Sequence, residues 1–443
     1  MVALSQSFTT TLSCTCGACA MVRSAFAVDG SFSPALHVRV PDVPIMGIVA
    51  ITGPSGCGKS LFMAEVERQH PGSLRPRAPR DEEVLHLVHR APEETLRLLA
   101  EIGLGDPRIY LSRYSVLSDG QRERVKLLIA LLNNSPIVLA DEFLSPLDRV
   151  SARIVASGIG RFCRRTGKCL VVASASDDYL DDLRPDTHVR FDSTGLATVE
   201  AFVSTGPRLI DLVSILNGSL NDYIELAQYH YGGELAVAGL DCGFTVWRAV
   251  LDDELVGVRV LGSPYLREWD ALDAIREINE CIDVSYRTIV HPRFRGMGVA
   301  GRLIREGRST KRVLWARGAM GLYHPWHASG GMDYLPQGRT LSAKLDRRPS
   351  GWQDVGSRHL LEDEQLARLM LEFDHLREIS GLGDPTRAQR EEVVALFRGG
   401  LVRMTDEQLL TDYNPYPCAE AVQYRESIIA KDIDACRGEQ RRS

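Results

Sequence analysis

The chain has 443 residues, of which 44% are hydrophobic and 25% charged, and its formal net charge is −6. This balance is typical of a water-soluble globular protein with two or three domains. No run approaches the roughly eighteen consecutive apolar residues of a membrane span, and no basic region followed by an apolar run begins the chain. A cytoplasmic protein with no membrane partner is therefore expected. The negative charge gives no global attraction to nucleic acid, but it does not exclude a local basic face.

Three of the ten cysteines, Cys14, Cys16 and Cys19, lie together in the sequence CTCGAC. Their spacing suits metal ligands, but a zinc or iron–sulfur site normally uses four ligands, and no fourth lies at a recognisable distance. We therefore favour an incidental segment of small residues over a metal site. The other cysteines are scattered through apolar segments, which indicates reduced thiols rather than a disulfide framework.

The stretch GPSGCGKS, residues 53–60, follows an apolar strand pattern at Met46–Thr52 and precedes a helical pattern. This is the context of a P-loop, in which backbone N–H groups at a helix N-terminus surround phosphates. Lys59 is expected to reach the β- and γ-phosphates of ATP, and the Ser60 hydroxyl to bind Mg²⁺. Phe26 is a candidate for stacking on adenine, although a core phenylalanine is the favoured alternative. The predicted ATP-binding residues are Gly53, Ser55, Gly56, Cys57, Gly58, Lys59, Ser60 and Phe26.

Three further motifs follow: LSDGQ at residues 117–121, an apolar strand that ends in Asp141 and Glu142, and SPLD at residues 145–148. With the P-loop, this set resembles the ABC-type ATPases, with their signature, Walker B and D-loop motifs. By position, the resemblance implies that Asp141 holds Mg²⁺ and that Glu142 is catalytic and polarises the attacking water. It also implies a homodimer with two composite ATP sites, each closed by the signature of the other protomer. The signature residues are Leu117, Ser118, Asp119, Gly120 and Gln121.

Two departures from that family bear on function. The interval between Ser60 and Leu117 is short and contains no convincing Q-loop glutamine, which disfavours coupling to a membrane partner. The predicted strand at Cys169–Leu180 lacks the switch histidine, since Ala175 or Ser176 stands in its place. Slow hydrolysis is therefore expected, with ATP acting as a switch or clamp.

A second phosphate-binding motif lies in the second half of the chain. A hairpin pattern at residues 243–261 and a strand pattern at Asp283–Val290 precede HPRFRGMGVAG. The spacing Arg293-x-x-Gly296-x-Gly298, between a strand and a helix, resembles the pyrophosphate loop of the GNAT N-acetyltransferases. The resemblance implies acetyl-CoA or a related acyl-CoA as cofactor, held by an active enzyme or by a degenerate binding module. The implied acyl-CoA residues are Val290, Arg293, Arg295, Gly296, Met297, Gly298 and Ala300.

Histidines near a closing Gly-Met pair are the candidates for proton transfer. His327 lies four residues before Gly331 and could act as the general acid, with His324 on the same helix face. Helix-capping or structural histidines are favoured over this role, and a two-histidine metal site is the third alternative. No base can be assigned firmly. His230 belongs to a segment that could line a base-sized pocket, although an amphipathic helix packed on the sheet is favoured. The substrate candidates are His230, Asp283, Tyr323 and His324.

As a whole, the order of motifs resembles archaeal, bacterial and phage proteins in which an ABC-type ATPase is fused to a predicted acetyltransferase domain. The second half resembles, more distantly, the Mom DNA-modification proteins of phages, which suggests a nucleic-acid substrate. The expected architecture is an α/β ATPase domain at residues 1–200, a GNAT-like α+β domain at 201–340 and a helical extension at 341–443. The expected function is an ATPase coupled to N-acylation of a nucleic-acid base. The alternatives are a non-catalytic nucleic-acid clamp and a transporter ATPase.

Overall fold

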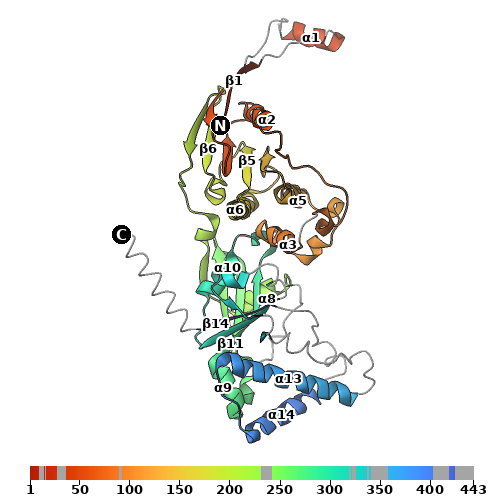
Figure 1. Ribbon diagram of the computed structural model, residues 1–443, viewed down its shortest axis with the longest axis vertical. Helices are drawn as coiled ribbons and strands as arrows, with labels where there is room; N and C mark the ends of the chain where they lie inside the picture. Colours follow the sequence, from red (N-terminus) through yellow and green to blue (C-terminus); the bar gives the residue numbers. More distant parts are fainter. Residues whose placement is uncertain are drawn as a thin grey trace, which may run out of the picture. The chain divides into compact units, whose positions relative to one another are not determined.

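The computed structural model describes residues 1–8, 14, 16–26, 36–88, 92–230, 242–318, 321, 326–336, 339–340, 358–402 and 419–424. The chain forms two compact units, whose elements are labelled in Figure 1. Unit 1 contains Met1–Leu212 and Arg293–Met297, and unit 2 contains Val213–Pro292 and Gly298–Ser443. The three-domain division expected from the sequence stays a prediction.

Unit 1 is built on a five-stranded sheet of order β4-β5-β3-β6-β7, in which only β7 is antiparallel to its neighbour. Parallel strands covered on both faces are buried along their whole length, as every residue of β3 and β4 is here. The strands of this sheet are β3 (Ile48–Thr52), β4 (Ile137–Ala140), β5 (Cys169–Ser174), β6 (Thr187–Phe191) and β7 (Ala197–Ala201). The helices of unit 1 are α1 (Gly17–Ala25), α2 (Lys59–Gln69), α3 (Pro92–Glu101), α4 (Pro107–Tyr110), α5 (Asp119–Leu132), α6 (Arg149–Thr166) and α7 (Leu180–Leu183).

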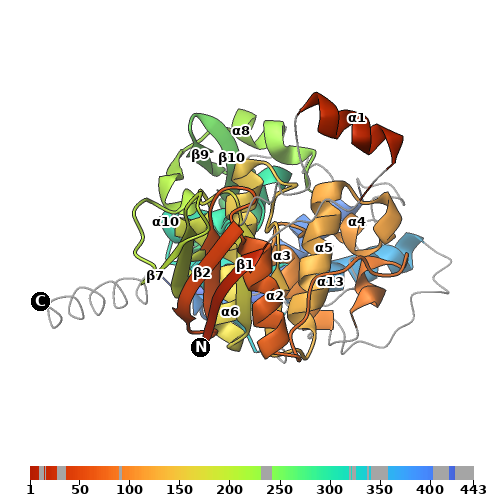
Figure 2. The same cartoon turned by 90° about the horizontal axis from the view of Figure 1, so that it is seen from above.

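A second, smaller sheet completes the core of unit 1. It pairs β1 (Val2–Phe8) with β2 (Leu36–Val43) in antiparallel fashion, and Figure 2 shows both strands near α2 and β7. Phe62, Met63 and Val66 of α2 are buried in one cluster with residues from both sheets. Helix α2 therefore bridges the two sheets, which fixes the position of the P-loop that precedes it.

Unit 2 contains a seven-stranded sheet of order β13-β14-β12-β11-β10-β9-β8. The predicted hairpin is confirmed as β9 and β10, joined by Asp252 and Asp253, which have φ of 48° and 65°. Two positive φ values match the right-handed twist of a two-residue hairpin. The strands are β8 (Ser214–Asn217), β9 (Thr245–Leu251), β10 (Glu254–Gly262), β11 (Ile282–Val290), β12 (Val313–Gly318), β13 (Asp333–Tyr334) and β14 (Ala419–Tyr424). The helices are α8 (Leu220–Ala227), α9 (Asp273–Cys281), α10 (Val299–Glu306), α11 (Trp326–Ser329), α13 (Arg358–Ser380) and α14 (Arg387–Leu401).

The last hundred residues are not only helical, which corrects the expected helical extension. Helices α13 and α14 lie in the region expected to be helical, but β14 pairs with β12 and β13 inside the sheet of unit 2. Phe373 and Phe397 of the two helices share a buried cluster with Ile275, Trp315 and other residues of unit 2. The C-terminal helices are therefore packed into the core of this unit.

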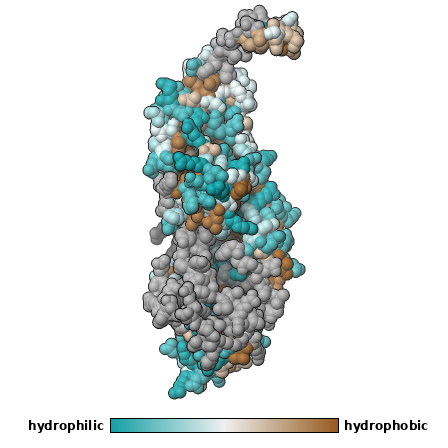
Figure 3. All heavy atoms as spheres, turned by 90° about the vertical axis from the view of Figure 1, so that its right-hand side faces the viewer, coloured by the Kyte–Doolittle hydropathy of each residue, from teal (hydrophilic) through white to brown (hydrophobic). Residues whose placement is uncertain are grey.

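The described residues include no helix long and apolar enough to span a membrane. On the face drawn in Figure 3, hydrophobic side chains occur in small groups among hydrophilic ones. Small groups of exposed apolar side chains are normal on protein surfaces and carry no functional implication by themselves.

Candidate functional site

The P-loop has the predicted local structure. It follows β3 directly, and Gly53, Gly56 and Gly58 have φ of 150°, 79° and 108°. Gly58 is the residue before the first turn of α2, so the free N–H groups of the helix N-terminus lie at the end of the loop. The Lys59 ammonium donates hydrogen bonds to the carbonyl oxygens of Gly53 and Pro54, at 2.7 and 2.6 Å. The Lys59 side chain thus folds back along the loop that is expected to bind the phosphates.

Packing explains why glycine is needed at the two ends of this loop. A Cβ atom on Gly58 would lie 2.6 Å from Cγ2 of Val38 on β2, which is 1% exposed. A Cβ atom on Gly53 would lie 2.7 Å from Cβ of Phe191 on β6. The sequence motif indicates the phosphate function but not these neighbours, which come from distant strands.

The signature motif begins α5, as the resemblance implies. The Ser118 hydroxyl accepts a hydrogen bond from the Gln121 N–H, and the Gln121 side chain accepts one from the Ser118 N–H. This reciprocal capping holds the helix N-terminus in a defined geometry. Leu117 is buried, whereas the Asp119 side chain is 88% exposed. A Cβ atom on Gly120 would lie 2.8 Å from Leu147, so the signature contacts the D-loop directly.

The acidic pair follows β4. Asp141 is half-buried, accepts a hydrogen bond from the Glu142 N–H, and lies 3.9 Å from the Arg75 guanidinium. Glu142 is exposed and has a left-handed backbone, with φ of 50°. A positive φ in a residue other than glycine is uncommon and concentrates at functional sites. Leu144, two residues later, has φ of 59°, so the turn after β4 is left-handed at both positions.

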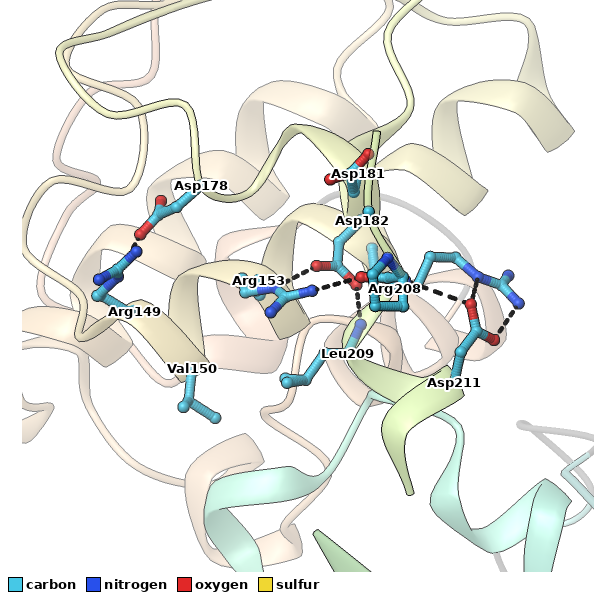
Figure 4. A network of polar contacts seen from close by, with 12 residues as sticks. Arg149, Val150, Arg153, Asp178, Asp181, Asp182, Arg208, Leu209 and Asp211 are labelled. Carbon is cyan, nitrogen blue, oxygen red and sulfur yellow. Dashed lines mark hydrogen bonds and ion pairs between the residues drawn. The ribbon is translucent and has the colours of Figure 1, made fainter. Parts of the chain in front are cut away.

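The position of the missing switch histidine lies just after β5. The Ser176 hydroxyl donates a hydrogen bond to Asp178, which also accepts one from Arg149 at the start of α6, each at 2.6 Å. Figure 4 shows this Arg149–Asp178 pair beside a second one, in which Asp182 accepts from Arg153 and from the Leu209 N–H. The Asp182 side chain is 1% exposed. These bonds fix the start of α6, which follows the D-loop, to the segments after β5.

Two glycines of the second glycine-rich motif have φ values close to those of Gly56 and Gly58 in the P-loop. Gly296 and Gly298 have φ of 85° and 108°, and Gly298 precedes the first turn of α10 as Gly58 precedes that of α2. Gly298 is exposed, whereas Met297 is buried. Both motifs therefore present a helix N-terminus through two left-handed glycines.

Several residues of this second motif already have partners within unit 1. The Arg293 guanidinium lies 3.5 Å from Asp148 of the D-loop, and that of Arg295 lies 3.1 Å from Asp106. The Gly296 carbonyl accepts a hydrogen bond from Arg161 at 2.7 Å, and a Cβ atom on Gly296 would lie 2.6 Å from the Gly103 nitrogen. Close packing is thus a second physical reason for glycine at position 296.

In unit 2, β11 and β12 are parallel neighbours whose pairing runs from Ile282↔Val313 to Ser285↔Ala316. Beyond that point β11 continues to Val290 and leads toward α10, while β12 continues to Gly318. The carboxyl ends of parallel strands are where α/β sheets bind ligands. The acyl-CoA site that the sequence predicts would therefore lie where these two strands separate, at the N-terminus of α10.

A buried arginine that the sequence did not single out supports α10. Arg259 of β10 is fully buried and donates to the carbonyl oxygens of Leu303, Ile304 and Gly307 at the end of α10. A cation is favoured at this end of a helix. Burial lowers the Arg259 pKa to about 9, and Asp283 opposes this effect. Arg259 is the single charged residue in the apolar segment LVGVRVL, and this exception is the sequence feature that could have identified it.

The structure does not support His327 as a protonated general acid. His327 is 1% exposed and stacks on Trp326, with ring centroids 3.7 Å apart. Burial and the nearby Arg259 lower its pKa to about 3, so the imidazole is neutral near pH 7. The Tyr334 hydroxyl lies 3.4 Å from its Nδ1 atom, and burial raises the Tyr334 pKa to about 12. Tyr334 therefore keeps its proton at neutral pH. The sequence analysis did not identify this residue as a candidate.

The other candidates have mixed outcomes. Asp283 accepts a hydrogen bond from Ser309 and lies 2.9 Å from the Lys311 ammonium, so its carboxylate already has two partners. Helix α8 buries Tyr223 and Leu226 against the sheet, as the favoured alternative predicted for the segment that ends near His230.

Phe26 is 75% exposed, so the core alternative is wrong. Its adenine role, like the ligand roles of Val290 and Ala300, stays a prediction. Tyr323 and His324 lie outside the described residues.

No protein-family model matches the chain. The chain is 40% identical over 81 residues to the phosphonates import ATP-binding protein PhnC 2 of Pseudomonas syringae pv. syringae, a match that covers 18% of this chain and 28% of that protein. It is 31% identical over 165 residues to the putative ABC transporter ATP-binding protein YjkB of Bacillus subtilis, which covers 30% of this chain and 65% of that protein.

An ABC-type P-loop ATPase-like domain occupies part of the chain. Its homology implies ATP and Mg²⁺ as ligands. The chain spans between 28% and 37% of the length of the first phosphonate import proteins that it matches. Among solved structures, the dimeric bacterial ABC transporter cassette MJ0796 is similar, with 18% identity and a TM-score of 0.32, over 45% of this chain and 98% of that one.

Proposed function

We propose that this protein is an ABC-type ATPase coupled to an acyl-CoA-dependent N-acyltransferase. The observation that carries the proposal is the shared backbone of the two phosphate motifs. Gly56 and Gly58 have φ of 79° and 108°, and Gly296 and Gly298 have φ of 85° and 108°. In each case a strand comes before the motif and a helix starts directly after it. Successive N–H groups in such a turn form a concave site for anions.

In the ATPase half, each predicted residue has a defined task. Lys59 would leave the carbonyl oxygens of its own loop and bind the terminal phosphates. Ser60 and Asp141 offer the hydroxyl and carboxylate oxygens that Mg²⁺ prefers, and bound Mg²⁺ would neutralise charge on the phosphates. Glu142, exposed after β4, would accept a proton from the attacking water. The exposed Ser118 and Asp119 suit a homodimer in which the signature of one protomer closes the site of the other.

Slow turnover fits the residues after β5. Ser176 stands near the switch position, and its hydroxyl already donates to Asp178. A serine engaged in this way supplies no imidazole to the terminal phosphate. ATP binding would then act mainly as a clamp, with hydrolysis resetting it.

In the acyltransferase half, the N-terminus of α10 would bind the pyrophosphate of CoA. Where the β11–β12 pairing ends, an extended amide chain such as that of CoA could lie along the strand. Arg259 holds the opposite end of α10 to the sheet, which orients the helix. The Tyr334 hydroxyl, protonated at neutral pH, replaces His327 as our candidate to protonate the departing thiolate.

The acceptor that we propose is an amine on a nucleic-acid base. Support comes from the distant resemblance of the second half to phage DNA-modification proteins and from the presence of a clamp-like ATPase in the same chain. Nucleoside mass spectrometry of DNA and RNA from expressing cells should detect a new species that disappears with Gly298→Trp. Its absence in both nucleic acids would refute this acceptor and leave the CoA proposal open.

Calorimetry tests the cofactor directly. Acetyl-CoA should bind the wild type, and Gly298→Trp should abolish binding, because the indole would fill the exposed helix N-terminus. Gly399→Trp on α14 is the matched control, since a Cβ atom there meets nothing within 4 Å. A change of acetyl-CoA affinity with ATP and Mg²⁺ would show that the two activities are coupled. No binding by the wild type would refute the acyltransferase and favour a non-catalytic clamp.

The clamp is a real alternative because Arg295 and Gly296 are engaged within unit 1 and need no CoA to explain them. A transporter ATPase is favoured only by the names of the sequence relatives. Fractionation of expressing cells separates this last alternative from the others, because a transporter subunit should sediment with membranes.

A further inference from the structure

Cys14, Cys16 and Cys19 converge at the start of α1. Their three Sγ atoms all lie within 4.8 Å of one another, and those of Cys14 and Cys16 are 3.5 Å apart. Zinc–thiolate bonds of about 2.3 Å in tetrahedral geometry place sulfur atoms about 3.8 Å apart. The described sulfur positions therefore need only small shifts to surround a single ion.

The backbone explains this convergence. Cys16 is the residue before α1, with an extended backbone at φ −60° and ψ 158°, and Cys19 is the third residue of the helix. Side chains at these two positions face each other, as they do in a capping box. Cys16 makes no side-chain capping hydrogen bond. Cys14 lies two residues before Cys16, and the Sγ atoms of the two residues are 3.5 Å apart.

Helix α1 also lacks the usual source of stability. It has nine residues, and none of them is buried. Isolated helices shorter than about 12–15 residues are marginal in water, because tertiary packing normally supplies their stability. A metal ion bound at the first turn would supply it instead, since binding free energy at such a site becomes folding free energy.

We propose that Cys14, Cys16 and Cys19 form a three-thiolate site for a thiophilic divalent cation of the zinc type. Cys14 and Cys16 are exposed and Cys19 is partly exposed, so the fourth coordination position is open to solvent. An iron–sulfur cluster fits less well, because clusters normally use four cysteines. The site is independent of the two phosphate motifs, and the sequence alone had favoured an incidental segment.

The test uses the full-length protein, stripped of metal and kept reduced with a phosphine. Titration with Co²⁺ should give thiolate-to-cobalt charge-transfer and tetrahedral d–d bands that saturate at one ion per chain and disappear on adding Zn²⁺. The variant Cys14→Ser/Cys16→Ser/Cys19→Ser should lose both bands. The control Cys169→Ser/Cys281→Ser, which removes two partly exposed cysteines elsewhere, should keep them.

Hydrogen exchange gives a second readout. Zn²⁺ should slow exchange of the amides of Gly17–Ala25 in the wild type and not in the triple variant. The proposal is overturned by an absence of cobalt bands in the wild type, by bands that persist in the triple variant, or by iron–sulfur absorption in protein as purified. ATP binding by the triple variant shows that unit 1 is folded, so a metal result is separable from the proposed function.

Discussion

Gly58→Ala is the sharpest test of how the P-loop is built. The new Cβ atom would lie 2.6 Å from Cγ2 and 3.0 Å from Cγ1 of Val38, at a backbone φ of 108°. A left-handed backbone costs an L-residue about 1–2 kcal/mol, and overpacking a well-packed core costs about 1–3 kcal/mol. The free energy of unfolding should therefore fall by about 2–5 kcal/mol, a large part of the usual total of about 5–15 kcal/mol.

The assay is urea unfolding followed by circular dichroism, with Gly399→Ala as control. Gly399 lies in α14 with open space around it, so alanine there should stabilise the protein by about 0.5–1 kcal/mol. At ATP concentrations near a hundred times Kd, the wild type should gain about 2.7 kcal/mol, and Gly58→Ala should gain less. If Gly58→Ala stays within about 0.5 kcal/mol of the wild type, with or without ATP, the structural account of this loop is refuted.

Three further outcomes are expected. Asp182→Ala removes the buried partner of Arg153 and should lower the free energy of unfolding by about 3–5 kcal/mol. The control Asp211→Ala breaks an exposed ion pair and should lower it by less than about 1 kcal/mol. Equal losses of the two variants in urea unfolding would contradict the burial argument. Because the His327 pKa is lowered from 6.5 to about 3, the unfolded chain binds the proton more readily, and stability should fall as pH drops from about 6.5 toward 3. His327→Phe should reduce the pH dependence of the free energy of unfolding by up to about 1.4 kcal/mol per pH unit, as measured by unfolding followed by tryptophan fluorescence. An unchanged pH dependence would refute the role of His327. Gly120→Ala should cost less than about 1 kcal/mol, because the flexible end of Leu147 can move, and a larger loss of stability by thermal unfolding would show a rigid signature–D-loop contact.

Local motifs were predictable because their information is local. The strand, glycine turn and helix around Gly53–Ser60 follow from neighbouring residues, and so does the hairpin around Asp252 and Asp253. The capping of α5 by Ser118 and Gln121 also lies within four residues. Such features depend on backbone conformation and short-range hydrogen bonds, which composition and spacing reveal directly.

Roles that depend on burial were not predictable. His327 had the right spacing for a general acid, but its stacking on Trp326 and the proximity of Arg259 leave it neutral. Phe26 had the composition of a core residue and is exposed. The pKa of a side chain and its exposure are set by neighbours from other strands and helices, and one sequence does not name them.

By itself, the sequence determined that this chain carries two glycine-rich motifs, each placed between a strand and a helix. Only the tertiary structure decided that Gly296 packs against Gly103 and that β14 enters the sheet of unit 2. The physical reason is range: a turn needs a few adjacent dihedral angles, whereas packing needs segments whose separation along the chain the sequence pattern does not encode.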